Sequence, residues 1–229
     1  MAFEEEMRAS VDSYARNHLA DDQWHFAYFN FIGDEKLARR LGEEFLAARY
    51  IYKLLEGLGV DGWKQKAQIR FQILSYASIY EASLHQLLFV DNADDPKVKK
   101  MTEYSQYKEI SVPRNSSRAL EKFLSHDGKK IIPTYKGIGR TDQTKVRFDR
   151  KAECACELGM IETWLRDDLI EFYEARNSIH IHAEIRKNLE YELKLSALAY
   201  WRMQPFRNQI IKWQSERAQN TLPLKTNIP

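Results

Sequence analysis

The segment from Gly33 to Gly59 contains the feature that most constrains the fold, a long helical repeat of apolar residues. Apolar side chains recur there at spacings of three and four, at Leu37, Leu41, Phe45, Ala48, Tyr52 and Leu55. This spacing places them on one face of an amphipathic helix. Because only 9 glycines and 6 prolines interrupt the 229 residues, long helices are expected to dominate the chain.

Two further stretches show helical patterns. Residues 63–89 predict a long, largely buried helix, and the chain from 151 to about 219 is helical again. In the second stretch we expect breaks near Gly159 and near Asn177, together with a kink at Pro205.

The middle of the chain differs in composition. Residues 91–100, DNADDPKVKK, predict a polar linker, and Ser116 or Ser117 is a suitable N-cap for a short helix. Residues 129–150 alternate apolar and polar side chains on either side of KGIGRTDQ, which indicates a β-hairpin. The predicted fold class is therefore an all-α helical bundle with a small inserted β-hairpin.

The same boundaries predict the domain organisation. Residues 1–62 are expected to form an N-terminal helical extension, and residues 63–219 a helical domain with an insertion at about 91–150. Residues 220–229, NTLPLKTNIP, are expected to be a loose tail.

Composition restricts the class of protein. With 44% hydrophobic and 30% charged residues, a soluble globular protein is expected, and the net charge of +2 argues neither for nor against nucleic acid as a partner. The N-terminus lacks the apolar run of a signal peptide, and no window approaches the ~18 apolar residues of a membrane span. Cys154 and Cys156 are too few for a four-thiolate zinc site. We expect reduced thiols in a cytoplasmic protein without membrane association.

The segment YEARNSIHIHAE, residues 173–184, holds the candidate site. Arg176, Asn177, His180 and His182 lie within seven positions, although the whole chain has only six histidines. The histidines are open to three interpretations: packing neighbours of buried isoleucines, metal ligands, or acid–base groups. As metal ligands they are poorly arranged, because residues two apart point roughly 160° apart on a helix. No metal site is predicted.

Acid–base chemistry on a phosphodiester suits these residue types better. An arginine offers a planar, permanently charged fork for phosphate oxygens. A neutral histidine can accept the proton of a ribose 2′-hydroxyl, so neither a metal nor a cofactor is required. In an unbroken helix Arg176 shares a face with His180, whereas a kink at Asn177–Ser178 would let His182 reach the same place.

The sequence ARNSIHIH resembles the R-x4–6-H signature of the HEPN superfamily, all-α domains found in ribonuclease toxins, phage-defence effectors and RNA-guided RNases. Arg176 and Asn177 match its first two positions, and His182 matches the last with five residues between. His180 has only three residues between and falls outside the strict spacing, although some HEPN-like families have R-N-x-I-H. The resemblance covers roughly residues 63–215.

The surroundings of the motif add to the resemblance, because the superfamily carries a glutamate amid apolar residues on an early long helix. SYASIYEASLHQLLF matches this with Glu81, which we expect either to pair with Arg176 or to face solvent. The resemblance implies a metal-independent endoribonuclease in which Arg176 binds the scissile phosphate and Asn177 orients the histidine or the phosphate. His182, or failing it His180, would be the general acid or base.

The resemblance also implies partners. The substrate would be RNA, cleaved to a 2′,3′-cyclic phosphate and a 5′-hydroxyl. Family members build the site across a two-fold axis, so a homodimer is expected, supported by large apolar residues that include Trp164, Tyr173, Tyr200 and Trp201. A role in defence or as a toxin, with an antitoxin or defence-system partner protein, follows from the family alone.

Two other features bear on RNA binding. Residues 126–151 hold eight Lys or Arg against three Asp, among them Lys136, Arg140, Lys145 and Arg147. This predicts either a basic hairpin that contacts RNA phosphates or an exposed edge kept soluble by its charges.

The aromatic group Trp24, Phe26, Tyr28, Phe29 and Phe31 is suited to stacking on bases, but we favour a place in the core.

A second class of function uses the same residues. A non-catalytic helical module would bind RNA, a nucleotide or a partner protein through the same groove. An active enzyme should bring Arg176 and a histidine to one open cleft, whereas a binding module could leave them apart or buried.

Overall fold

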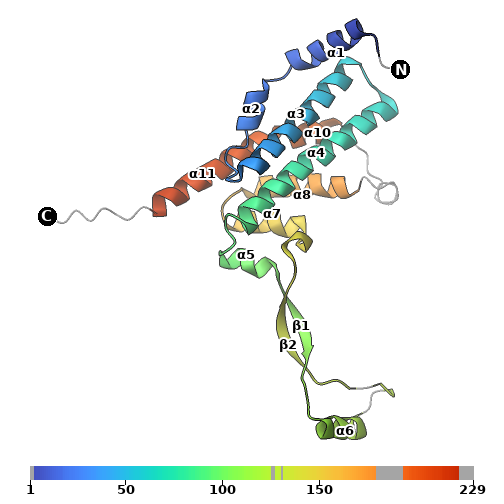
Figure 1. The fold of residues 1–229 in the computed structure, drawn as a ribbon, viewed down its shortest axis with the longest axis vertical. Helices are drawn as coiled ribbons and strands as arrows, with labels where there is room; N and C mark the ends of the chain where they lie inside the picture. The colour runs from blue at the N-terminus through green and yellow to red at the C-terminus, as the bar shows by residue number, and fades with distance from the viewer. Residues whose placement is uncertain (1–2, 125–126, 130, 179–192, 222–229) are drawn as a thin grey trace, which may run out of the picture. The chain divides into compact units, whose positions relative to one another are not determined.

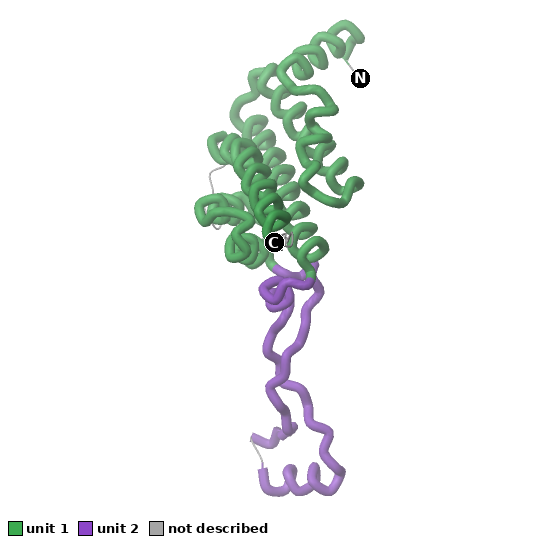
Figure 2. The backbone as a smooth tube through the Cα atoms, turned by 90° about the vertical axis from the view of Figure 1, so that its left-hand side faces the viewer, with its two compact units in different colours: residues 1–93, 147–229 green, residues 94–146 purple. Residues whose placement is uncertain are grey.

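The computed structural model of the chain describes residues 3–124, 127–129, 131–178 and 193–221. It divides into two compact units, which Figure 2 distinguishes by colour. The helical unit comprises residues 1–93 and 147–229, and the inserted unit comprises residues 94–146. Over the described residues the chain is mostly helical, with one small antiparallel sheet of two strands, as the sequence predicted.

The helical unit is built around one long central helix (Figure 1). Its helices among the described residues are α1 (Glu5–Asn17), α2 (Asp22–Ala27), α3 (Glu35–Gly57), α4 (Gly62–Phe89), α7 (Phe148–Glu157), α8 (Thr163–Asn177), α10 (Leu193–Trp201) and α11 (Met203–Thr221). Helix α4 contacts α3, α7, α8 and α10, while α3 also contacts α1 and α2. The predicted extension therefore lies in the same unit as α4.

Helix α4 is largely buried over its second half, where apolar side chains outnumber polar ones. Ile73, Tyr80 and Leu84 have no measurable exposure. The Tyr80 hydroxyl donates a hydrogen bond of 2.8 Å to the carbonyl oxygen of Ala199 in α10, which satisfies a polar group inside the core. This hydrogen bond joins the first half of the chain to the last.

Helix α3 follows its apolar repeat. The Asp34 side chain caps its N-terminus by accepting a hydrogen bond of 2.9 Å from the Leu37 backbone N–H. Its buried face includes Leu41 and Phe45, as the spacing predicted. Gly42 lies where α2 crosses, since a Cβ there would be only 2.8 Å from the carbonyl oxygen of His25.

The expected breaks between helices are confirmed. Helix α7 ends at Glu157, Gly159 has a φ of +75°, and α8 begins at Thr163. Helix α8 ends at Asn177. At Pro205 a kink was expected; α10 ends at Trp201 and α11 begins at Met203, so that the proline lies in the first turn of α11. A proline is tolerated there because the first N–H groups of a helix have no intrahelical partner.

The aromatic group near the N-terminus lies mainly in the core, as favoured. Tyr28, Phe29 and Phe31 are buried, and Phe29 meets Phe45 edge to face with ring centroids 5.8 Å apart. Trp24 and Phe26 are the exceptions, because 42% of Trp24 is exposed and Phe26 is half-buried. The burial of the other rings removes them from any base-stacking surface.

The inserted unit consists of short elements. They are α5 (Pro96–Met101), β1 (Glu103–Glu109), α6 (Arg114–Phe123), β2 (Thr134–Arg140) and the 3-10 helix η1 (Gln143–Lys145). Strands β1 and β2 pair antiparallel, from Glu103 opposite Arg140 to Glu109 opposite Thr134. The prediction of a polar linker at 91–100 is wrong in part. Its second half belongs to α5, in which Val98 and the last residue, Met101, are buried.

A small two-stranded sheet exists as predicted, but the strands and the turn predicted for it within residues 129–150 were wrong. The expected turn KGIGR belongs to β2, whose partner is β1 and not residues 144–150. Val146 and Phe148 supplied the alternation of that second stretch, and they are buried around the start of α7 instead. Strand β1, EYSQYKE, has no apolar face that could have predicted it. The predicted serine cap of the short helix is also wrong, because α6 begins after Pro113 without a side-chain cap.

Candidate functional site

A cluster of polar side chains surrounds the carboxylate of Glu81, in the middle of the buried helix α4. Its Oε2 lies 3.4 Å from Nη1 of Arg176 on α8, and its Oε1 lies 3.8 Å from Nζ of Lys151 on α7. The Tyr173 hydroxyl donates a hydrogen bond of 3.2 Å to Oε1. Of the two expectations for Glu81, the structure has the contact with Arg176, although 28% of the Glu81 side chain is still exposed.

The spacing along α8 explains how Tyr173 and Arg176 come to lie together. Residues three apart are neighbours on a helix surface. The guanidinium carbon of Arg176 lies 4.9 Å from the centroid of the Tyr173 ring, within the range of a cation–π contact. Tyr173 is itself packed against Phe148 of α7: the two rings are stacked, with centroids 4.4 Å apart and an interplanar angle of 16°. The arginine is thus held by a carboxylate and by a ring that is itself packed.

The cluster has more positive than negative charge. Lys151 is only 2% exposed, and burial lowers its pKa while the nearby Glu81 carboxylate opposes that shift. Burial raises the pKa of Tyr173, and the charge of Glu81 adds to the effect, so that the phenol remains a hydrogen-bond donor at neutral pH. Two cations share one carboxylate, which leaves capacity for a further negative group near Arg176.

A hollow of about 190 Å³ adjoins the cluster on the side of Asn177, and its lining residues are Arg147, Phe148, Asp149, Ile170, Tyr173, Glu174 and Asn177. Asn177 is exposed at the end of α8. Arg147 is paired with Asp149 at 2.7 Å. Arg176 is not among the lining residues, because its side chain is directed toward Glu81.

The end of α8 determines where the motif leaves the helix. Ser178 is the C-cap residue: its N–H donates to the carbonyl oxygens of Glu174 and Ala175, and its hydroxyl donates to the Glu174 carbonyl at 2.7 Å. Ser178 therefore caps the C-terminus of α8, in addition to any role at the start of a following helix. His180 and His182 lie outside the described residues, so the choice between them stays a prediction.

The basic residues predicted to contact RNA do not form one set. Lys136 and Arg140 lie on β2, and Lys145 lies in η1, all three exposed in the inserted unit. Arg140 pairs with Glu103 across the strands at 3.3 Å. Arg147 belongs to the helical unit.

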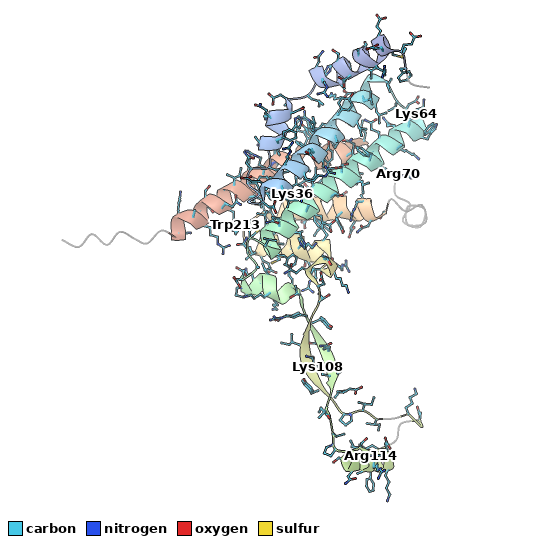
Figure 3. The ribbon with its side chains drawn as sticks, viewed as in Figure 1. Lys36, Lys64, Arg70, Lys108, Arg114 and Trp213 are labelled. Atoms are coloured by element: carbon cyan, nitrogen blue, oxygen red, sulfur yellow. The ribbon has the colours of Figure 1, made fainter. Side chains whose placement is uncertain are left out.

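Further basic side chains lie on the inserted unit and on the segment that follows it. Lys108 on β1 and Arg114 at the start of α6 add to the exposed basic side chains of the inserted unit (Figure 3). Lys151, which the sequence grouped with the basic hairpin, is buried in α7 beside Glu81, and that part of the prediction is wrong. Its ammonium group is unavailable to an RNA chain.

Sequence reasoning missed the roles of Tyr173 and Lys151. A signal for Tyr173 was present, since it precedes Arg176 by three residues on a predicted helix. No comparable signal existed for Lys151, because its position in a run of basic residues resembled a solvated surface. Among the residues with described positions, no group of three or more His, Cys, Asp or Glu is arranged to hold a metal ion. Cys154 is buried and Cys156 half-buried, both on α7, and neither forms a disulfide.

Comparison of the chain with protein-family models, with curated proteins and with solved structures finds no match. The HEPN resemblance therefore depends on the motif and its surroundings. A search of the described helices for one with the length and apolar character of a membrane span finds none.

Proposed function

We propose that the chain is a metal-independent endoribonuclease of HEPN type, with a HEPN-like helical domain. The observation that carries the proposal is the restraint of Arg176. Glu81 and Tyr173 hold its guanidinium, while 28% exposure of the side chain leaves part of the fork open to a phosphate. A pre-positioned cation is what a site for a charged transition state needs, because little reorganisation is then required during the reaction.

The reaction would use the ribose 2′-oxygen as the nucleophile. As that oxygen bonds to the adjacent phosphorus, its proton passes to His182, or to His180 in its place. The bond from phosphorus to the 5′-oxygen of the next nucleotide breaks, and that oxygen leaves with the electron pair and takes up a proton. Arg176 stabilises the extra charge on the phosphate oxygens, and Asn177 orients the histidine or the phosphate. The products are a 2′,3′-cyclic phosphate and a 5′-hydroxyl.

The test is cleavage of end-labelled RNA by the purified chain in EDTA, with analysis of the product ends. His182→Ala should reduce the rate by roughly 10²–10⁴-fold, the usual contribution of general acid–base catalysis, and His180→Ala should have a smaller effect. Arg176→Ala should be at least as damaging, and Arg176→Lys should restore only part of the rate because lysine lacks the planar fork.

The matched control is Arg166→Ala. Arg166 also lies on α8, its side chain is also 28% exposed, and it is paired with the carboxylate of Asp167. This variant should cleave like the wild type. If the wild type does not cleave RNA, or if Arg166→Ala and Arg176→Ala lose activity equally, the endoribonuclease proposal fails. Reversal of the two histidine effects would move the catalytic role to His180.

The proposal includes a homodimer. Of the large apolar residues expected near a subunit interface, Trp164 remains 41% exposed on α8, and exposed aromatic side chains are enriched at protein interfaces. Light scattering at micromolar concentration should report twice the chain mass of 27.1 kDa. A monomer would contradict a site shared between two copies. A defence or toxin role, with its partner protein, has no support beyond the resemblance.

A non-catalytic module that binds RNA, a nucleotide or a partner protein is the second candidate. One observation favours its partner-protein form: Asp149 and Glu174 are among the residues that line the hollow beside Asn177, and carboxylates repel the phosphates of RNA and of nucleotides. RNA binding by the wild type without cleavage, weakened by Arg176→Ala, would support this candidate over the enzyme.

A further inference from the structure

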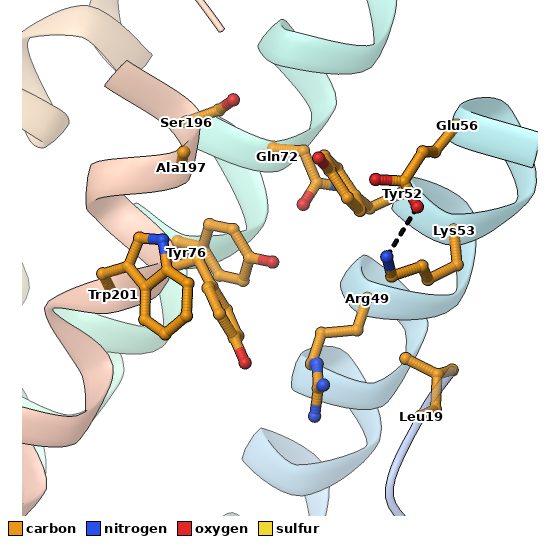
Figure 4. A pocket seen from close by; sticks show the side chains of 11 residues that line it. Leu19, Arg49, Tyr52, Lys53, Glu56, Gln72, Tyr76, Ser196, Ala197 and Trp201 are labelled. Carbon is orange, nitrogen blue, oxygen red and sulfur yellow. Dashed lines mark hydrogen bonds and ion pairs between the residues drawn. The ribbon is translucent and has the colours of Figure 1, made fainter. Parts of the chain in front are cut away.

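A second hollow, separate from the Glu81 cluster, lies between α3, α4 and α10 in the helical unit (Figure 4). It has a volume of about 280 Å³, and its lining residues are Leu19, Arg49, Tyr52, Lys53, Glu56, Gln72, Tyr76, Ser196, Ala197, Tyr200 and Trp201. Small-molecule sites typically span roughly 300–1,000 Å³, so this hollow suits a small ligand and not a polymer. Its lining combines aromatic rings with two cations.

The two cations differ in how they are neutralised. Lys53 pairs with Glu56 on the same helix, with Nζ 2.5 Å from Oε2. Arg49 has no carboxylate partner within the described part of the chain; its guanidinium instead lies over the rings of Trp24, Phe45 and Tyr200. Taking an arginine partly out of water without a counter-charge is costly, and an anionic ligand would offset that cost.

Arg49 is also held in a fixed position by His25. The His25 ring is fully buried, and its Nδ1 donates to the Asp21 carbonyl oxygen at 2.8 Å. Nε2 is then the acceptor for Arg49 Nη1, at 3.0 Å. Burial lowers the pKa of His25, which favours this neutral form. One N–H of the guanidinium is used in this way, and the others remain for a ligand.

Aromatic side chains form the opposite wall. Trp201 is 66% exposed at the mouth of the hollow, and Tyr200 packs edge to face against it with ring centroids 5.1 Å apart. Tyr76 is 2% exposed and lines the floor, and its hydroxyl makes no hydrogen bond to another described residue. A planar ring stacked on Trp201 would cover apolar surface that is otherwise open to water, and a ligand oxygen could accept from Tyr76.

We propose that this hollow binds a small ligand that combines one planar aromatic ring with one anionic group, of the class of a nucleoside monophosphate. The ring stacks on Trp201, and the phosphate accepts hydrogen bonds from Arg49. Because Lys53 is neutralised by Glu56, the site supplies one uncompensated cation and favours a monophosphate over a triphosphate. This hollow shares no residue with the Arg176–Glu81 contact or with the hollow beside Asn177.

The test is calorimetric titration of the whole chain with AMP and GMP, and with two fragments, adenosine and ribose 5-phosphate. The wild type should bind at least one nucleotide at least tenfold more tightly than either fragment, because each fragment lacks one half of the recognised chemistry. Arg49→Gln should weaken nucleotide binding by tenfold or more and leave adenosine binding unchanged. Trp201→Ala should weaken nucleotide binding by about 5–150-fold, the range of base–aromatic stacking.

Matched controls come from α3 and α4, two of the helices that surround the hollow. Arg39→Gln removes an arginine of α3 that is paired with Glu43, and Trp63→Ala removes a ring of α4 that is 77% exposed. Neither residue lines the hollow, so both variants should bind like the wild type. Trp201 is exposed, so its variant should fold even if Arg49→Gln does not.

Three results would overturn the proposal: no nucleotide binding at millimolar concentration, equal affinity for the nucleotide and a fragment, or equal loss in Trp201→Ala and Trp63→Ala. RNA cleavage by the same preparation is measured separately, so failure at one site is distinguishable from failure at the other.

Discussion

Removing the charge of Glu81 should destabilise the helical unit, because its carboxylate is shared by two cations. It lies 3.4 Å from Arg176 and 3.8 Å from Lys151. Coulomb's law gives about 4 kcal/mol for two unit charges at such a separation, with an effective dielectric constant of about 20. The Glu81 side chain is 28% exposed, so solvent screens part of this energy. We expect Glu81→Gln to cost roughly 2 kcal/mol, a fall in Tm of about 4–8 °C.

A second substitution isolates the cause. Lys151 is 2% exposed, so in Glu81→Gln its ammonium group is buried without a counter-charge. Adding Lys151→Met to that variant should recover about 1 kcal/mol or more, because replacing a buried charge by an apolar group of similar length is often neutral or stabilising. In the wild type, Lys151→Met alone should stay within about 1 kcal/mol of neutral, since Arg176 and Tyr173 remain as partners of Glu81.

The assay is urea unfolding at pH 7, followed by far-UV circular dichroism. Glu171→Gln serves as the control, because Glu171 is an exposed carboxylate on α8 outside the cluster. Equal stability of Glu81→Gln and Glu171→Gln would refute the reasoning. The reasoning would also be refuted if Lys151→Met destabilised the Glu81→Gln variant as much as it destabilises the wild type.

Three further predictions test other parts of the chain. Gly42→Ala should cost roughly 1–3 kcal/mol by urea unfolding, because its Cβ would lie 2.8 Å from the His25 carbonyl oxygen, whereas Gly33→Ala has nothing within 4 Å and should be neutral. Because the folded-state pKa of His25 lies below its usual 6.5, its contribution to stability is complete above pH 6.5 and is lost as the pH falls through the folded-state value. The Tm of the wild type should therefore fall more steeply below pH 6.5 than the Tm of His25→Gln. Parallel curves of Tm against pH would contradict a lowered His25 pKa. The charged groups that act on the ring are Arg49 and the two aspartates Asp21 and Asp22. Replacing the exposed basic residues of the inserted unit by Gln should weaken RNA binding and reduce the logarithmic salt slope by about 0.7 for each phosphate that is no longer neutralised, and an unchanged slope would mean that these residues, Lys136, Arg140 and Lys145, only solvate the edge.

The helices of the larger unit could be predicted because their signals are local. The apolar repeat of α3 and the apolar-rich sequence of α4 lie within single segments, and a helix brings residues three and four apart together whatever surrounds it. The break at Asn177 was predictable for the same reason, from a short polar stretch after an apolar one. Arg176 was a candidate because its residue type and its neighbours in sequence indicate phosphate chemistry.

The strand pairing could not be predicted, because it depends on contacts between distant segments. Strand β1 has no apolar face, so nothing in EYSQYKE marks it as the partner of β2. Gly137 and Gly139 were interpreted as a turn, whereas in the strand Gly139 gives room to the side chains of Gln106 and Tyr104. A glycine is compatible with both conformations, and only the opposing strand decides between them.

By itself the sequence determined that this chain is helical, where its main helices begin and end, and which short motif carries a candidate chemistry. Only the tertiary structure decided how those residues are used. It brings Tyr173 to Glu81 across 92 positions and buries Lys151 beside them. It also places Arg49 among aromatic rings, where no described carboxylate pairs with it. The physical reason is range: helix periodicity is set by neighbours along the backbone, whereas burial, charge pairing and a binding hollow require side chains from separate helices to meet.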